Sequence, residues 1–276
     1  MKEEVGEKMR KSPLISVVIA LYNSGRTLDR CIESIAEQTY GNWELVLIDS
    51  DSKDETPQIA KKWIKSLGED RCRYYNIMKR GHPAKRNFGI QQARGDLLFF
   101  NDSDQYLPLT AFEECLRLIE QGNEGIHIRA VSDFEGKSYF SKCNTLSIEL
   151  FTAGEGIRAP SMVRLDHAEL LYQDEDLDWV DDSLTMARFK ERDLKIASIH
   201  SPMIHDRDIP LRSLVLKTHF IVLANKKQSK EQMIDGRFMQ EFPEKMLWLI
   251  KSQPTNVPGV LLAFLVRTSV RMTTMI

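Results

Sequence analysis

The sequence predicts an α/β fold in which a mainly parallel sheet is flanked by helices and followed by a helical C-terminal extension. Short apolar runs rich in β-branched residues alternate with stretches whose apolar residues recur every three or four positions. A polar cluster follows the first, second and fourth of these runs. Ligands of parallel α/β sheets bind outside the carboxyl ends of the strands, so the clusters are expected to form a binding site.

Four strands and three helices are predicted in the first hundred residues, in alternating order. Continuous apolar runs mark the strands, because a parallel strand is covered on both faces. The predicted strands are residues 14–20, 43–48, 73–78 and 97–100. The predicted helices are residues 28–35, 59–67 and 84–93.

The second half is predicted from weaker patterns of the same kind. Helices are expected at residues 112–119 and 181–192, and strands at 125–131, 138–140 and 195–199. The predicted organisation is a polar tail at 1–12, one domain at 13–209 and a mainly helical extension at 210–276. Within the domain, two halves are expected, at residues 13–107 and 108–209.

Composition excludes some classes of protein and favours others. The formal net charge is -2, so the basic surface expected of a nucleic-acid binder is missing. The four cysteines have neither zinc-site nor disulfide-framework spacing, which favours a reducing compartment. The first residues lack the apolar stretch of a secretory signal, so a cytoplasmic location is expected.

One apolar segment near the end, Val257 to Val266, is relevant to membrane contact. It is shorter than the roughly 18 residues needed to span a bilayer. It is followed by Arg267 and Arg271. Two alternatives stay open: a C-terminal helix packed on the body of the protein, or a peripheral contact on the cytoplasmic face of a membrane.

A D-x-D tripeptide, Asp102-Ser103-Asp104, directly follows the fourth predicted strand. Two carboxylates with this spacing at a strand end can share a hard divalent cation such as Mg²⁺ or Mn²⁺. Lys85 and Arg86 lie at the expected start of a helix. Cationic side chains and helix N-terminal amides both suit a diphosphate, although a solvated basic helix face would show the same pattern.

The run ISVVIALYNSGRTLDRCIESIAEQTYGNWELVLIDSDSKDET, together with KRNFGIQQARGDLLFFNDSDQYLP, resembles the nucleotide-binding half of the inverting family-2 glycosyltransferases. The resemblance extends from Leu14 to about Thr218, and the first hundred residues carry its most specific part. It implies the GT-A fold, a Rossmann-like, mainly parallel sheet. Asp49 is followed by Ser50 where the family commonly has a second acid, a variant similar to archaeal members.

The resemblance also implies roles for individual residues in binding a UDP- or GDP-sugar. Asp49 becomes the polar contact of the base, and the residue at position 50 leaves the choice between uridine and guanosine open. Asp104 becomes the chief protein ligand of Mg²⁺ or Mn²⁺, and His205 approaches the metal or the diphosphate. The other residues implied in nucleotide-sugar binding are Leu21, Tyr22, Asn23, Lys85, Arg86, Asp102 and Ser103, with Asp102 also near the cation.

The acidic segment DEDLDWVDD is similar to the one that supplies the family's catalytic base. Asp182 is the first candidate and Asp181 the second. A shifted register would use Glu175 and Asp176 instead, and acids at a helix N-terminus are also favoured by the helix dipole alone. His82, next to the proposed diphosphate segment, is a further candidate contact.

Together with these residues, the resemblance implies a metal-dependent inverting glycosyltransferase that moves a sugar to a glycan, a lipid-linked glycan or a lipid phosphate. A catalytically silent sugar-nucleotide binder on the same fold is the alternative. A nucleotidyltransferase is disfavoured because LYNSGRT does not resemble a glycine-rich phosphate loop. A nicotinamide-dependent oxidoreductase is disfavoured because G-x-G-x-x-G is absent from the same turn.

Overall fold

The computed structural model describes residues 12–78, 81–151, 159–175, 182–206 and 250–262. The chain divides into two compact units. The first contains the described residues of 12–131 and 159–205, and the second those of 132–151, 206 and 250–262. The described residues 132–151 group with the C-terminal part of the chain, whereas the predicted domain at 13–209 included them.

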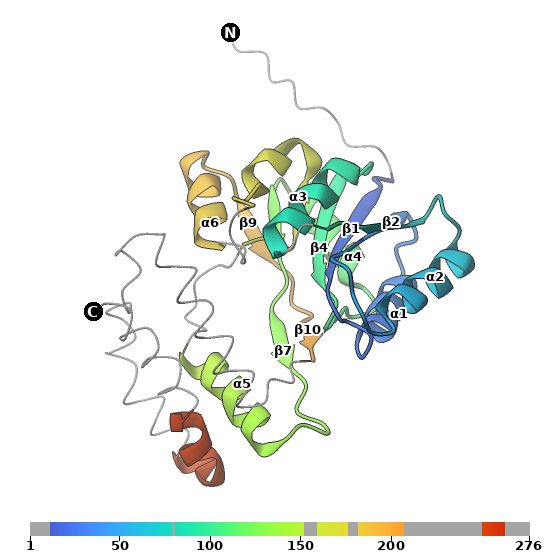
Figure 1. Ribbon diagram of the computed structural model, residues 1–276. Helices are drawn as coiled ribbons and strands as arrows, with labels where there is room; N and C mark the ends of the chain where they lie inside the picture. Colours follow the sequence, from blue (N-terminus) through green and yellow to red (C-terminus); the bar gives the residue numbers. More distant parts are fainter. Residues whose placement is uncertain (1–11, 79–80, 152–158, 176–181, 207–249, 263–276) are drawn as a thin grey trace. The chain divides into compact units, whose positions relative to one another are not determined.

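The first unit is built on a seven-stranded sheet in the order β3-β2-β1-β4-β8-β6-β9 (Figure 1). Four neighbouring pairs are parallel, and β8 runs antiparallel between β4 and β6. The prediction of a mainly parallel sheet is therefore confirmed. The strands are β1 (Ile15–Leu21), β2 (Trp43–Asp49), β3 (Cys72–Asn76), β4 (Leu97–Asp102), β6 (Gly125–His127), β8 (Met162–Arg164) and β9 (Ile196–Ser198).

Helices cover both faces of this sheet, and a small second sheet lies in the order β5-β10-β7. Its strands are β5 (Gln105–Tyr106), β10 (Met203–His205) and β7 (Ala130–Ser132). The helical elements of the first unit are α1 (Leu28–Ala36), α2 (Thr56–Leu67), α3 (His82–Gln92), α4 (Ala111–Glu120), the 3₁₀-helix η1 (Leu165–Leu171) and α6 (Asp182–Glu191).

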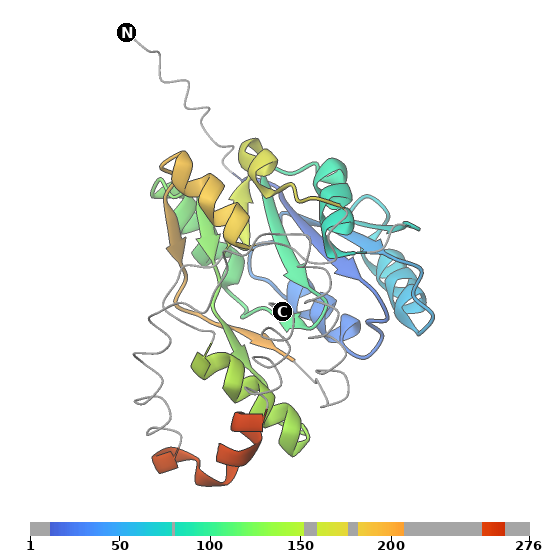
Figure 2. The ribbon, with the colours of Figure 1, turned by 60° about the vertical axis from the view of Figure 1, so that its left-hand side comes forward.

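Alternating side chains of the central strands fill two apolar layers. Val17 and Ile19 of β1 pack with α1, α2 and α4 on one face. Val18 packs with α3, η1 and α6 on the other face, where Phe189 of α6 is fully buried. Figure 2 shows α6 beside η1 in this second layer. Both layers hold the carboxyl ends of the strands in a fixed arrangement.

Two glycines allow close backbone approach around α3. A Cβ at Gly89 would lie 2.2 Å from Cγ1 of Val18, so glycine lets α3 pack directly on β1. A Cβ at Gly95 would lie 2.5 Å from the carbonyl oxygen of Leu14. The next residue, Asp96, accepts a hydrogen bond of 2.8 Å from the backbone N–H of Leu14. These contacts fix the entry of the chain into β4.

A buried carboxylate, Glu44 of β2, organises the amino ends of the strands. It accepts hydrogen bonds from Ser16 Oγ at 2.7 Å and from Arg73 Nη2 and Arg94 Nε at 2.8 Å each. Burial alone would raise the pKa of Glu44, but the hydrogen bonds from Ser16 and Arg94 outweigh it and leave the pKa below its usual value. This network lies at the end of β2 opposite Asp49.

Two predictions for the second half are corrected. The single strand expected at 125–131 is two strands, β6 and β7, which belong to different sheets. The strand expected at 138–140 is wrong, because Tyr139 begins helix α5 (Tyr139–Phe151). A segment of three residues with two aromatic side chains is too short to distinguish a strand from the first turn of a helix.

The second unit contains α5 and the helical residues 250–262, which include the 3₁₀-helix η2 (Pro254–Asn256). Val260 is fully buried and packs in a small cluster with Cys143 and Leu146 of α5. The hydroxyl of Tyr139 donates a 2.7 Å hydrogen bond to the carbonyl of Thr255. Of the apolar segment considered for membrane contact, residues 257–262 are described, and the remainder lies outside the described residues.

No helix in the described ranges has the length and hydropathy required to cross a bilayer. The extension predicted at 210–276 is described only at 250–262, where it is helical as expected.

Candidate active site

The sheet register brings the predicted site segments together. Leu21 at the end of β1 pairs with Asp49 of β2, and Ala20 pairs with Asp102 of β4. These three strands are parallel neighbours, so the loops that follow them emerge at one edge of the sheet. The polar clusters noted in the sequence therefore share one site, as the strand-end rule requires.

The loops after β1 and β2 are tied to each other by hydrogen bonds. Asn23 has a positive φ of 49°, and its backbone N–H donates to Ser52 Oγ at 2.8 Å. Its Oδ1 accepts a 2.9 Å hydrogen bond from the N–H of Lys53. Ser24 donates its N–H to Thr56 Oγ1 at 2.7 Å. Asn23 therefore shapes the loop, because asparagine tolerates the left-handed conformation better than most residues.

Asp49 is fully buried, and its carboxylate is engaged by the protein itself. Oδ1 accepts a 2.5 Å hydrogen bond from Ser52 Oγ, and Oδ2 accepts one of 2.7 Å from the Tyr74 hydroxyl. Burial and this hydrogen bond raise the pKa of Tyr74, so its hydroxyl stays protonated and continues to donate. Asp49 thus positions the loop after β2, and its predicted contact with the base stays a prediction.

Lys85 lies on the first turn of α3 and is almost fully buried, with 3% of its surface exposed. Its Nζ donates a 2.9 Å hydrogen bond to the carbonyl of Leu21 and lies 5.9 Å from the ring centroid of Tyr22. Burial lowers the pKa of Lys85 to about 8, although the charge of Asp49 opposes this shift. The Tyr22 side chain is 52% exposed, so it presents a ring to solvent beside this cation.

The D-x-D turn is held by two neutral side chains that the sequence analysis did not single out. Asn101 Nδ2 donates to the carbonyls of Asp102 and Gln105, at 3.1 and 3.0 Å. Gln105 Nε2 donates to Asp102 Oδ2, and Gln105 Oε1 accepts from the N–H of Asp102, both at 3.1 Å. Ser103 Oγ lies 2.9 Å from Ser24 Oγ, which joins this turn to the loop after β1.

Cationic groups surround Asp102. Arg86 Nη2 donates to Asp102 Oδ1 at 3.1 Å and its guanidinium lies 5.0 Å from the ring centroid of Phe100. Burial raises the pKa of Asp102, but the charges of Arg86, His82 and His205 outweigh burial and leave it below the usual value. Asp102 is therefore ionised at neutral pH. His82 contributes one of the charges that lower its pKa, and the contact of His82 with the diphosphate stays a prediction.

Asp104 and His205 are in contact across the turn. His205 Nε2 lies 3.2 Å from Asp104 Oδ1, and His205 on β10 pairs with Gln105 on β5. The Asp104 side chain is 36% exposed, whereas that of His205 is 9% exposed. The sequence predicted both residues at one site, and the structure brings them together.

The described side chains at the D-x-D turn are of types that suit a divalent cation. A carboxylate oxygen and an imidazole nitrogen are suitable ligands for Mn²⁺, and carboxylate oxygens suit Mg²⁺. Within the described ranges, no group of three or more His, Cys, Asp and Glu side chains could hold a metal ion.

The candidates for the catalytic base are only partly described. Asp182 is the first residue of α6 and is exposed. Asp181 and Asp176 lie outside the described residues. Glu175, from the alternative register, has its Oε1 3.1 Å from Asn87 Nδ2 on α3. Asp182 is available to solvent, whereas Glu175 is held against the helix that carries Lys85 and Arg86.

The fold and this edge of the sheet define a protein of the GT-A class. Residues 16–167, more than half of the chain, match Glycosyl transferase family 2. The chain belongs to this family.

The curated relatives match less than half of the chain. Glycosyltransferase GlyG of Streptococcus pneumoniae is 30% identical over 133 residues, which is 47% of this chain and 44% of GlyG. The uncharacterized glycosyltransferase EpsJ of Bacillus subtilis is 30% identical over 109 residues, 40% of this chain and 31% of EpsJ. The chain thus spans less than half the length of these relatives.

Solved structures confirm the fold over most of the chain. Residues 1–349 of TarS from S. aureus, in complex with UDP-GlcNAc, are 17% identical with a TM-score of 0.57, and the match covers 90% of this chain and 79% of that solved chain. The mannosyltransferase PcManGT of Pyrobaculum calidifontis, in complex with GDP-Man and Mn²⁺, is 16% identical with a TM-score of 0.55. That match covers 93% of this chain and 75% of PcManGT.

Proposed function

We propose that this chain is a metal-dependent, inverting glycosyltransferase that moves a sugar from a nucleoside-diphosphate sugar to an acceptor hydroxyl. The observation that supports this proposal most strongly is that β1, β2 and β4 end at the same edge of the sheet. It places the Asp104–His205 pair and the Arg86–Asp102 pair beside the joined loops after β1 and β2. Anion-binding and cation-binding groups at one edge suit a diphosphate bound together with a divalent cation.

The donor is proposed to lie across this edge of the sheet. Leu21, Tyr22 and Asn23 would surround the base, and the exposed ring of Tyr22 is suited to contact it. Asp102 and Ser103 would face the ribose and the diphosphate. The solved neighbours bind UDP-GlcNAc in one case and GDP-Man in the other, so both bases remain candidates.

Asp104 and His205 would hold Mg²⁺ or Mn²⁺, with Asp102 close to the same position. Such an ion supplies positive charge that stabilises the phosphate oxygens of the leaving group. Arg86 adds fixed positive charge beside Asp102, and the Lys85 ammonium adds another near Leu21. These preorganised positive charges stabilise the negative charge that develops on the departing nucleoside diphosphate.

Asp182 is proposed to accept the proton of the attacking hydroxyl. A positioned carboxylate makes the acceptor oxygen a better nucleophile as it attacks the anomeric carbon. Direct attack opposite the leaving nucleoside diphosphate inverts the anomeric configuration. A lipid phosphate acceptor, which is already anionic, would depend less on this base, and the C-terminal segment would then be a candidate membrane contact.

The test is release of nucleoside diphosphate from UDP-GlcNAc and GDP-mannose, with Mn²⁺, with Mg²⁺ and with a chelator. Cation-dependent release from one of the donors is expected. The configuration of the sugar product, read by NMR, is expected to be opposite to that of the donor. Binding of a nucleotide without any turnover across a broad panel of donors and acceptors would instead support a catalytically silent binder.

The lowered pKa of Lys85 predicts how donor affinity changes with pH. Its ammonium carries full charge well below pH 8 and loses it as the pH rises through about 8. A bound diphosphate favours the charged form, so affinity is expected to be constant at lower pH and to fall by up to about tenfold per unit above it. Titration calorimetry of UDP and GDP between pH 6.5 and 9.5 measures this.

Lys85→Arg, which keeps its charge throughout this range, is the matched control. Its affinity is expected to stay level across the range. A wild-type profile that is equally level would contradict a role for the Lys85 charge in binding the diphosphate.

A further inference from the structure

A buried chain of hydrogen bonds connects α3 to α6. Asn87, Gln173 and Thr185 form it, and we call these three residues the polar strap. Asn87 Nδ2 donates to the Gln173 carbonyl at 2.8 Å, and the Gln173 N–H donates back to Asn87 Oδ1 at 3.1 Å. Gln173 Nε2 then donates to Thr185 Oγ1 at 2.9 Å. The three residues are 3%, 6% and 2% exposed, so water does not compete strongly for these bonds.

The polar strap links the two parts of the site that the proposed reaction requires. Asn87 directly follows Lys85 and Arg86 on α3. Thr185 lies one turn after Asp182 on α6. Gln173 belongs to the segment between η1 and α6, which leads into the acidic residues. Asn87 also donates to Glu175 Oε1 at 3.1 Å, so it fixes the beginning of that acidic segment.

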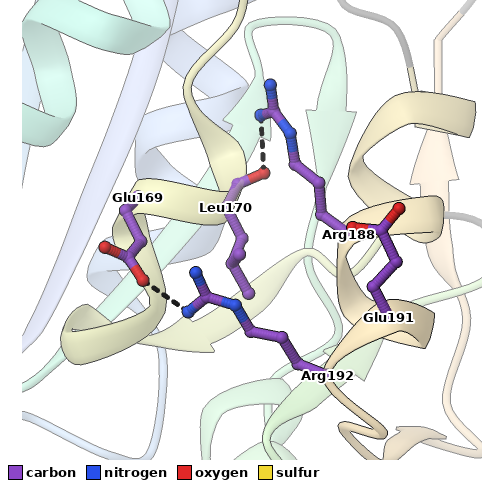
Figure 3. Close-up of a pocket in the computed structure, with 5 residues that line it drawn as sticks. All are labelled: Glu169, Leu170, Arg188, Glu191 and Arg192. Atoms are coloured by element: carbon purple, nitrogen blue, oxygen red, sulfur yellow. Dashed lines mark hydrogen bonds and ion pairs between the residues drawn. The ribbon is translucent and has the colours of Figure 1, made fainter.

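A second set of contacts fastens α6 to the same segment. Arg188 Nη1 donates to the carbonyl of Leu170 at 3.1 Å and to that of Tyr172 at 2.5 Å. Figure 3 shows the first of these bonds, and beside it the ion pair between Arg192 and Glu169. Phe189 packs in the apolar layer with Leu170 and Leu171. Apolar packing and the hydrogen bonds of Arg188 therefore hold α6 against η1. The polar strap adds a hydrogen bond of defined geometry between α6 and the segment that follows η1.

We propose that the polar strap is a positioning device that sets Asp182 relative to the donor held by α3, a proposal that rests on the proposed function. Apolar packing tolerates small shifts, whereas a fully satisfied buried hydrogen-bond network favours one arrangement. A displacement of about 1 Å in a reacting group can cost on the order of 100-fold in rate. Asn87, Gln173 and Thr185 are thus positioning residues and need not touch the substrate.

The test compares Thr185→Val and Gln173→Met with wild type. Both keep the volume of the side chain, and each removes the bond between Gln173 and Thr185. Nucleoside diphosphate release from UDP-GlcNAc and GDP-mannose is measured with Mn²⁺ and with water as the acceptor, using the donor that wild type turns over. The expected result is a fall in kcat of about tenfold or more with an unchanged KM for the donor.

Two further variants separate positioning from stability. Thr185→Ser keeps the hydroxyl and is expected to restore kcat. Gln38→Met removes another buried glutamine, whose Nε2 donates to the carbonyls of Ser34 and Pro108 at 3.0 and 2.8 Å, outside the proposed site. It is expected to lower Tm without lowering kcat per folded molecule. If Thr185→Val does not fold, Gln173→Met against Gln38→Met gives the same comparison.

The outcomes distinguish this inference from the function on which it rests. If wild type is active and both polar-strap variants keep its kcat, the positioning role is overturned and the proposed function stands. An equal loss of kcat in Gln38→Met would also overturn it, because the effect would then follow stability. Wild type that releases no nucleoside diphosphate from any donor would overturn the proposed function, and the positioning role with it.

Discussion

Replacing Asp104 with alanine is expected to abolish the cation-dependent part of donor binding while leaving the fold intact. Asp104 is partly exposed and contacts His205, so it is the carboxylate best placed to bind a cation together with a diphosphate. Changes in the surroundings of metal ligands already cost about 10- to 100-fold in affinity, and loss of a ligand should cost at least about 100-fold. Titration calorimetry with UDP and GDP in saturating Mn²⁺ measures the effect.

Asp29→Asn is the matched control for this variant. Asp29 is an exposed carboxylate of α1 that pairs with Lys62 at 2.8 Å. Its replacement is expected to leave the nucleotide affinity unchanged, since exposed ion pairs contribute little. If Asp104→Ala binds nucleotide in saturating Mn²⁺ as tightly as wild type, Asp104 is not the metal ligand.

Asp182→Asn is expected to suppress transfer to a hydroxyl acceptor without weakening donor binding. The amide keeps the shape of the side chain but cannot accept the proton of the acceptor. General-base assistance contributes on the order of 100- to 10,000-fold, so kcat should fall by that range. A thermal shift with the nucleotide, measured on the same preparation, checks that the donor site is unaffected.

Glu191→Gln provides the control at the other end of the same helix. Glu191 is the last residue of α6 and lines the pocket in Figure 3. This variant tests whether any loss of a carboxylate from α6 reduces turnover, and full activity is expected. Full activity in Asp182→Asn would transfer the role of base to Asp181 first and then to Asp176.

The parallel half of the fold could be predicted because its signals are local and mutually consistent. Apolar runs covered on both faces identified β1, β2 and β4, and the apolar periodicity identified α1. Because parallel strands share a carboxyl edge, the sequence also predicted that Asp49 and Asp102 would lie in one region. The register confirms this proximity, since Leu21 pairs with Asp49 and Ala20 with Asp102.

The residues that hold the site together could not be predicted in the same way. Asn101 directly precedes the D-x-D tripeptide and Gln105 directly follows it. Their hydrogen bonds depend on the local backbone conformation, which apolar periodicity does not specify. Asn87 and Gln173 are 86 positions apart in the sequence and interact only in the folded chain. A polar residue in a helix is usually solvated, so its sequence pattern gives no sign of burial.

The hydrogen-bond partners of Asp49 could not be predicted from the sequence either. The resemblance implied a contact between its carboxylate and the base. The hydrogen bonds that it accepts from Ser52 and Tyr74 show how the loop after β2 is fixed, and its contact with the base stays a prediction. The Tyr74 side chain comes from β3, so this arrangement depends on the pairing of β2 with β3.

The central claim is that one edge of the sheet binds a nucleoside diphosphate together with a divalent cation. The most direct test is the Tm of the wild-type protein with UDP or GDP, each with and without Mn²⁺, since a ligand of the native state raises Tm. A rise with one of the nucleotides that requires Mn²⁺ is predicted and would identify the base. No rise with either nucleotide, or a rise that is equal without the cation, would contradict the account.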